Sequence, residues 1–170
     1  MRGMRQVFGV AAAGLMLAGS VIGVSAHEHR EVGSYEFVVG FINEPAISEE
    51  LNGLSLRVTQ PQGPDAAAAT PVGDAATPAA AEPVQVGVEG LESTLQAEVI
   101  YGDQKMTLTL SPAWQDPGAY QSWFIPMQPG DYSFHIWGEI NGQQVDETFT
   151  SSPDGFDSVQ DRTTLQFPQP

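Results

Sequence analysis

The chain has 170 residues and a formal net charge of −15, with 21 acidic residues against six Lys and Arg. This balance excludes nucleic acid as a partner, because binding a polyanion requires a basic surface that releases counterions. It also disfavours anionic membrane surfaces, so cations are the compatible ligands. There is no Cys, so no disulfide can stabilise the fold and an ordinary hydrophobic core must do so.

Residues 1–26 have the pattern of a signal peptide. Arg2 and Arg5 form a positive n-region, residues 7–24 are apolar, and the Val-Ser-Ala exit at 24–26 fits the small-residue cleavage rule. The apolar run is long enough for an uncleaved membrane anchor, but its Ala and Gly content favours cleavage. We therefore predict removal after Ala26. The mature chain would keep four basic and 21 acidic residues, a net charge of −17, and would be secreted or periplasmic without a membrane span.

The first part of the predicted mature chain contains two strands and a low-complexity segment. Residues 27–31 are predicted to be a short polar arm, and the alternation of apolar residues predicts strands at Tyr35–Ile42 and Leu54–Val58. Residues 60–83 consist mainly of Ala, Pro, Gly, Thr and Asp, and the repeated Pro interrupts every helical window. We expect a disordered insertion in a surface loop of one domain that spans residues 27–170.

The second part contains a hairpin and then the stretch with the clearest pattern. A short strand is expected at Val84–Val88, and alternation on both sides of a Gly-Asp turn at 102–103 predicts a hairpin. Residues 117–149 predict three more strands. In the middle one, Tyr132, Phe134, Ile136 and Ile140 share a core face, and His135 and Trp137 lie on the other face. Asn-Gly at 141–142 predicts a type I′ turn.

About eight short strands, with no convincing helix after residue 26, predict an all-β fold. The expected architecture is a single immunoglobulin-like antiparallel β-sandwich of about seven to eight strands, with a small barrel as the alternative. Tyr132 after a Pro-Gly turn is typical of a tyrosine corner. A last edge strand is expected at Thr163–Phe167.

The three histidines are the candidate metal ligands: His27, His29 and His135. After the predicted cleavage the chain begins His-Glu-His. The α-amine, the amides of Glu28 and His29 and the His29 imidazole then suit a planar Cu(II) or Ni(II) chelate. Alternatively, the amine and imidazole of His27 chelate one copper ion, and His135 completes a histidine brace. The competing interpretations are a solvated arm with weak metal binding and, for His135, an ordinary outward strand residue.

Other features suggest weaker alternatives. Trp123 and Trp137 could share an exposed aromatic face that binds a protein, unless a loop covers it. The acids Asp154, Asp157 and Asp161 could supply oxygen ligands for Ca²⁺, although their spacing does not match an EF-hand. No GxSxG, HExxH or Cys nucleophile is present, so we expect a protein that is not an enzyme.

The His-Glu-His start and the stretch Pro129–Val145 together resemble periplasmic copper-resistance carrier domains of the CopC type, and the Pro-Gly-x-Tyr strand entry is similar to that of YtkA-like envelope domains. The resemblance implies a secreted β-sandwich in which the mature N-terminal His, here His27, binds Cu(II). The late-hairpin His of those carriers is replaced here by Gln143. The expected function is Cu(II) buffering or delivery in the cell envelope, with copper as cofactor. The alternative is a metal-free interaction module with an envelope protein partner.

Overall fold

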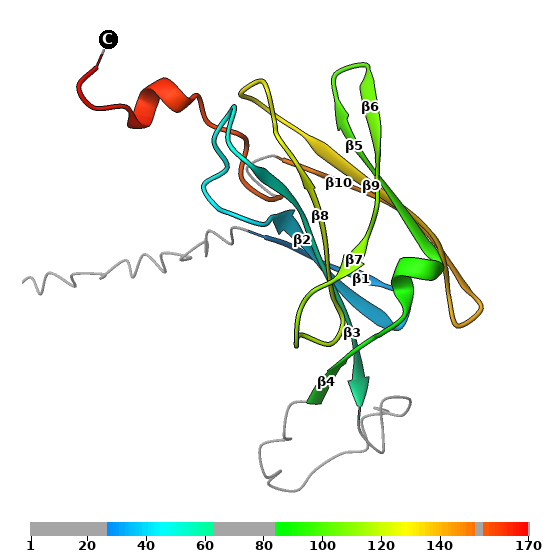
Figure 1. Ribbon diagram of the computed structural model, residues 1–170. Coiled ribbons are helices and arrows are strands. Elements are labelled where there is room, and N and C mark those ends of the chain that lie inside the picture. Colours follow the sequence, from blue (N-terminus) through cyan, green and yellow to red (C-terminus); the bar gives the residue numbers. More distant parts are fainter. Residues whose placement is uncertain (1–26, 63–83, 152–154, 170) are drawn as a thin grey trace, which may run out of the picture.

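Two antiparallel β-sheets pack face to face in the computed structural model, which describes residues 27–62, 84–151 and 155–169 (Figure 1). The first sheet has the order β1-β2-β3-β8-β7, with β4 also paired to β3, and the second has the order β10-β9-β5-β6. The strands are β1 (Glu28–Val32), β2 (Tyr35–Phe41), β3 (Asn52–Gln62), β4 (Val84–Gly87), β5 (Leu95–Tyr101), β6 (Gln104–Leu108), β7 (Ser111–Pro112), β8 (Ala119–Phe124), β9 (Ser133–Ile140) and β10 (Gln143–Thr150). The predicted all-β sandwich is confirmed, with ten strands in the described residues rather than seven or eight.

The core lies between the sheets and is rich in aromatic rings. Alternation along β9 buries Phe134 and Ile136, as predicted, because these side chains point toward the opposite sheet. Phe41 of β2 packs edge-on against Phe134 and against Phe156 from the C-terminal segment, at centroid distances of 5.4 and 5.5 Å. The core is therefore shared by both sheets and by the C-terminal segment.

The predicted turns are present. Asn141 and Gly142 have φ of 51° and 87°, the left-handed pair that a type I′ turn requires, and they join β9 to β10. Gly102 has φ of 56° in the two-residue turn between β5 and β6. The tyrosine corner is also confirmed, because the Tyr132 hydroxyl donates to the Gln128 carbonyl at 2.9 Å.

The expected polar arm at residues 27–31 is wrong for all but its first residue. Glu28 to Val32 form the edge strand β1, paired with β2 in the register Glu28 to Val39. Arg30 faces the rim between the sheets, where its guanidinium lies 4.3 Å from the Phe149 ring centroid and donates to Glu147 of β10 at 2.8 Å. The first four residues of this edge strand can all be polar, because only its last residue, Val32, is buried.

The expected edge strand at Thr163–Phe167 is also wrong. Residues Arg162–Leu165 form a short 3₁₀ helix, η2, and a second one, η1, spans Leu91–Ser93. The Asp161 carboxylate accepts hydrogen bonds from the amide and hydroxyl of Thr163 at 2.8 and 2.7 Å, which starts a helical turn instead of an extended chain. The predicted signal segment and residues 63–83 of the predicted insertion lie outside the described residues. The insertion was predicted to begin at residue 60, which is wrong for residues 60–62, because they end β3 and pair with β4.

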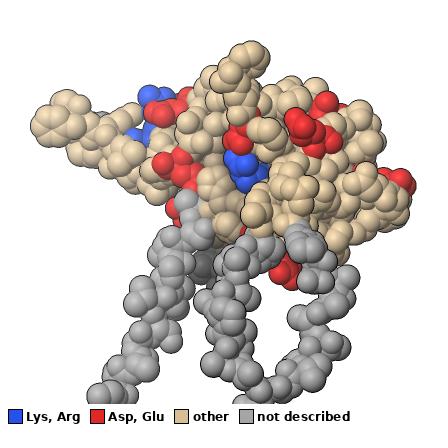
Figure 2. All heavy atoms as spheres, turned by 90° about the horizontal axis from the view of Figure 1, so that it is seen from below, with Lys and Arg blue, Asp and Glu red and all other residues tan. Residues whose placement is uncertain are grey.

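The surface reflects the acidic composition. Figure 2 shows acidic side chains in several separate patches on one face, with few basic side chains among them. Within the described part of the chain, no helix is both long and apolar enough to cross a membrane.

Candidate metal centre

His27 and Glu44 meet above Gly40, on the outward side of the first sheet. The register that pairs Glu28 with Val39 places His27 opposite Gly40, whose neighbours Val39 and Phe41 point into the core. A Cβ atom on Gly40 would lie 2.8 Å from His27 Cδ2 and 2.9 Å from Glu44 Oε1. A residue with a Cβ atom at this position would displace one of these two side chains.

The Glu44 carboxylate is buried with one oxygen unsatisfied. Its Oε1 accepts a hydrogen bond from the Phe41 amide at 3.1 Å, which anchors the group at the end of β2. Its Oε2 has no hydrogen-bond partner among the described residues and lies 3.8 Å from His27 Nδ1, in a side chain that is 9% exposed. The pKa of Glu44 is raised to about 7, mainly by burial. The hydrogen bond from Phe41 lowers this pKa, and the nearby charge of Asp157 raises it further.

The His27 imidazole is suited to act as a neutral ligand. Burial lowers its pKa, and the nearby His29 imidazole lowers it further. The 3.8 Å between His27 Nδ1 and Glu44 Oε2 is too long for a hydrogen bond. Two atoms that each bind one metal ion at about 2 Å can be this far apart. The pair can therefore offer one nitrogen and one oxygen to a cation.

His29 lies on the same side of β1 but has a different partner. Its side chain is 56% exposed, and its Nδ1 lies 3.0 Å from Glu36 Oε1 on β2. A planar chelate through His29 would also need the deprotonated amides of Glu28 and His29. These two residues open β1 and pair with Val39 and Val38, so such a chelate would disrupt the start of this ladder.

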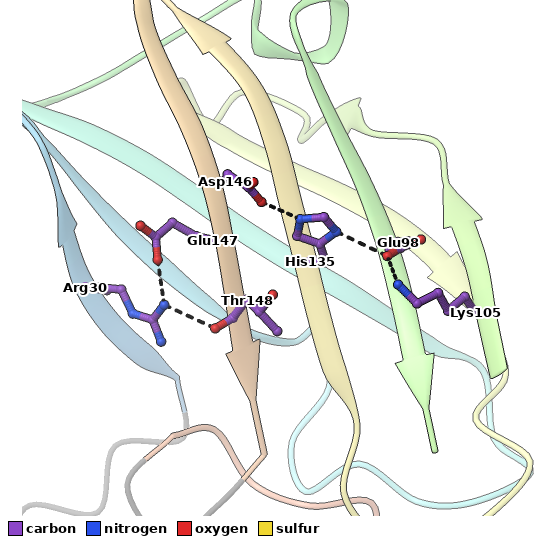
Figure 3. Close-up of polar contacts among 7 residues, drawn as sticks. All are labelled: Arg30, Glu98, Lys105, His135, Asp146, Glu147 and Thr148. Atoms are coloured by element: carbon purple, nitrogen blue, oxygen red, sulfur yellow. Dashed lines mark hydrogen bonds and ion pairs between the residues drawn. The ribbon is translucent and has the colours of Figure 1, made fainter. Parts of the chain in front are cut away.

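The structure does not bring His135 to His27. His135 lies on the outward face of β9 in the other sheet, so the sandwich core separates the two imidazoles. Figure 3 shows His135 between Asp146 and Glu98, at 2.7 Å from Nε2 and 3.1 Å from Nδ1, and Lys105 donates to Glu98 at 2.8 Å. The Asp146 hydrogen bond is the largest cause of a raised pKa for His135; Glu98 adds to the shift and burial opposes it. Both ring nitrogens are thus engaged with carboxylates.

The aromatic face expected from Trp123 and Trp137 is not formed. Trp137 stacks on His135 in β9, with ring centroids 4.6 Å apart, whereas Trp123 belongs to β8 and is 52% exposed. Strand β8 pairs with β3 in the first sheet, because the chain crosses between the sheets before β9 begins. The two tryptophans lie on consecutive strands, β8 and β9, but these strands belong to different sheets.

The three acids proposed for Ca²⁺ have separate environments. Asp154 lies outside the described residues. The charge of Asp157 contributes to the raised pKa of Glu44, and Asp161 caps η2. Across residues 27–62, 84–151 and 155–169, no group of three or more His, Asp or Glu side chains is arranged to hold a metal ion. His27 and Glu44 bring two such side chains together.

Glu44 and Gly40 were not singled out by the sequence. A signal for Gly40 was present, because a glycine inside a largely apolar strand indicates a close approach of another group. Nothing in the sequence marked Glu44 as a candidate ligand. Comparisons of the chain with protein-family models, curated proteins and solved structures found no match.

Proposed function

We propose that the mature protein binds Cu(II) in the cell envelope and buffers it or hands it on. Its ligands would be the α-amine and Nδ1 of His27 and the carboxylate of Glu44. The observation that carries the proposal is the buried Glu44 oxygen without a hydrogen bond, which lies near His27 Nδ1. Both side chains pack against Gly40, where a Cβ atom would displace one of them. The proposal takes up the histidine at the predicted mature terminus and replaces His135 by Glu44.

The donor set favours copper among divalent cations. An amine and an imidazole from one residue form a chelate, and with a carboxylate they give the nitrogen and oxygen donors typical of Cu(II) sites. First-row affinities for such a site rise to a maximum at Cu(II). A bound cation also supplies the positive charge that the buried Glu44 carboxylate lacks among its described contacts.

The proposed role is binding rather than catalysis. The chain has no nucleophile motif, and the His27 centre lies on an outward sheet face beside acidic residues, where a cation can be exchanged with solvent or with a second protein. A metal-free interaction module is the second candidate function. The observation that favours it is a separate apolar groove at the opposite rim of the sandwich.

The proposal is tested by Cu(II) titration of protein that begins at His27, in competition with a chelator of known affinity. The comparison is the same chain with one additional N-terminal Gly, which moves the amine away from the imidazole. We expect the additional residue to abolish tight binding and to change the Cu(II) electron paramagnetic resonance spectrum. Equal affinities in the two proteins would overturn the proposed centre.

A further inference from the structure

Strand β6 is an unprotected sheet edge. It ends the order β10-β9-β5-β6, and no described strand pairs with its outer side (Figure 1). It contains no proline and no acidic residue. Its single cation, Lys105, is turned along its own sheet to Glu98 at 2.8 Å. Natural proteins usually block a free edge with charges, prolines or a covering segment. The one such device on β6 in the described residues is Lys105, and its ammonium is paired within its own sheet.

An apolar groove runs beside this edge. Met106 pairs with the buried Val99 and so points to the core side of its sheet, yet it is 47% exposed. The cause is a cavity of about 220 Å³ between β6 and the segment after β8, into which Met106, Ile125 and Met127 project. A second cavity of about 360 Å³ continues along β6 from Met106 toward Trp123. The surface is thus hollowed on both sides of Met106, while Val99 and Leu108 remain buried.

The groove is a part of the surface that an acidic partner can approach. None of the residues that line its two cavities is acidic, although the chain has 21 acids. Two other cavities each contain acids, with Glu31 and Glu36 in one and Glu89, Glu92 and Asp116 in the other. A basic partner would be drawn to those acidic faces. A second copy of this acidic chain would meet the least repulsion at the groove.

The backbone of β6 allows a self-complementary pairing. A two-residue turn closes on a hydrogen-bonded pair, and such pairs alternate along an antiparallel ladder. The amides and carbonyls of Gln104, Met106 and Leu108 therefore pair with β5, and those of Lys105 and Thr107 point outward. In a two-fold arrangement centred on Met106, Lys105 lies opposite Thr107 of the second copy, which keeps the two lysines apart.

We propose that this protein forms a two-fold dimer through β6, in which two antiparallel β6 strands join the four-stranded sheets into one sheet of eight strands. Each Met106 then lies opposite its counterpart and helps to cover the groove of the other copy. The Arg30 contact with Glu147 joins β1 to β10 at the far rim, so the dimer leaves both His27 centres accessible. The dimer does not depend on copper binding.

Sedimentation velocity of the mature protein, from low micromolar to submillimolar concentration, tests the oligomeric state. We expect a concentration-dependent shift to twice the mass of one chain. Met106→Glu should give a monomer at all these concentrations, because it would place two carboxylates opposite each other in an apolar contact. The matched control is Trp114→Glu, which adds the same charge and removes a side chain that is 88% exposed outside the groove; it should dimerise like the wild type.

Amide hydrogen exchange identifies the contact. In the dimer the Lys105 and Thr107 amides should be protected, and in Met106→Glu they should exchange rapidly while the rest of the core keeps its protection. If the wild type is a monomer and these amides exchange rapidly, the proposal is overturned, and the groove would then be a binding site for a different protein. A monomer with protected amides would also overturn it, because another segment of the same chain would then cover the edge. A dimer that persists in Met106→Glu would place the interface elsewhere.

Discussion

At the scale of single residues, Glu44 combines a cost in stability with a ligand position. Its folded pKa of about 7 is above the ordinary carboxyl value of 4.5. Below pH 4.5 the carboxyl is protonated in both states, and as pH rises toward 7 only the unfolded state ionises. The contribution of Glu44 to folding therefore becomes less favourable between pH 4.5 and 7, and the cost remains above pH 7. Functional groups commonly carry such a cost.

We predict that Glu44→Gln changes stability and copper affinity in opposite directions. Gln keeps an oxygen that can accept the hydrogen bond from the Phe41 amide, but it has no charge to bury. The metal-free variant should therefore be more stable than the wild type at pH 8 by about 1–2 kcal/mol. This difference should vanish below pH 4.5. Urea unfolding at both pH values measures it, and Cu(II) competition should show weaker binding. Unchanged copper affinity would exclude Glu44 as a ligand.

Gly40 is the second residue whose role can be tested alone. Its backbone does not adopt a positive φ, so alanine is compatible with the strand conformation. The new Cβ must displace the His27 ring or the Glu44 carboxylate, which lie 2.8 and 2.9 Å away. We predict that Gly40→Ala weakens Cu(II) binding about tenfold, equivalent to ~1.4 kcal/mol, with the fold retained.

Ser55 supplies the matched control for this prediction, because it pairs with Gly40 across β2 and β3. Ser55→Ala should bind copper like the wild type. Circular dichroism of both variants checks that the sandwich is intact. If Gly40→Ala binds copper normally, the close approach of His27 to Gly40 is only a packing contact.

At the scale of elements, the strand β1 decides between the two chelates that the terminal sequence allows. The amides of Glu28 and His29 belong to the start of β1, and a planar chelate would remove them from it. A centre made by His27 and Glu44 leaves the strand intact. We therefore predict that His29→Ala retains tight Cu(II) binding, with an unchanged electron paramagnetic resonance spectrum. Loss of binding in His29→Ala together with normal binding in Glu44→Gln would select the planar chelate.

Elements with one buried face were predictable from the sequence, and elements at the rim were not. The alternation in β9 and the Asn-Gly turn after it are local patterns, and they identified the core strand correctly. Strand β1 was missed because its first four residues are polar on both sides, and η2 was missed because the Asp161 cap overrides a weak alternating pattern. The error over Trp123 and Trp137 has another origin, since consecutive strands need not share a sheet.

The candidate centre was only partly predictable, for a similar reason. His27 could be predicted as a ligand from the sequence, because its chelating chemistry depends on its position at a predicted cleavage site. Its contact with Glu44 depends on the pairing of β1 with β2, and the raised pKa of Glu44 depends on burial that local sequence does not report. His135 was predicted on the correct face of its strand. Its carboxylate partners come from β5 and β10, which only the sheet order brings together.

At the scale of the whole molecule, the net charge determines how the proposed dimer responds to salt. Two mature chains with a predicted charge of −17 repel each other. The one charged residue that lines the β6 groove, Lys105, is paired with Glu98 of its own chain and so does little to offset that repulsion. The screening length falls from about 30 Å at 0.01 M salt to about 8 Å at 0.15 M. We predict that dimerisation strengthens over this range, which sedimentation at the two salt concentrations measures.

The direction of this salt effect separates the second copy from a basic protein partner. Attraction between opposite charges would weaken with salt, whereas apolar and backbone pairing between like-charged copies should strengthen as repulsion is screened. Met106→Glu should remain monomeric at both salt concentrations, because salt in the solvent does not reduce the cost of burying two carboxylates opposite each other. A dimer that dissociates as salt is added would mean that charged side chains outside the groove hold it together, and β6 would then not be the interface.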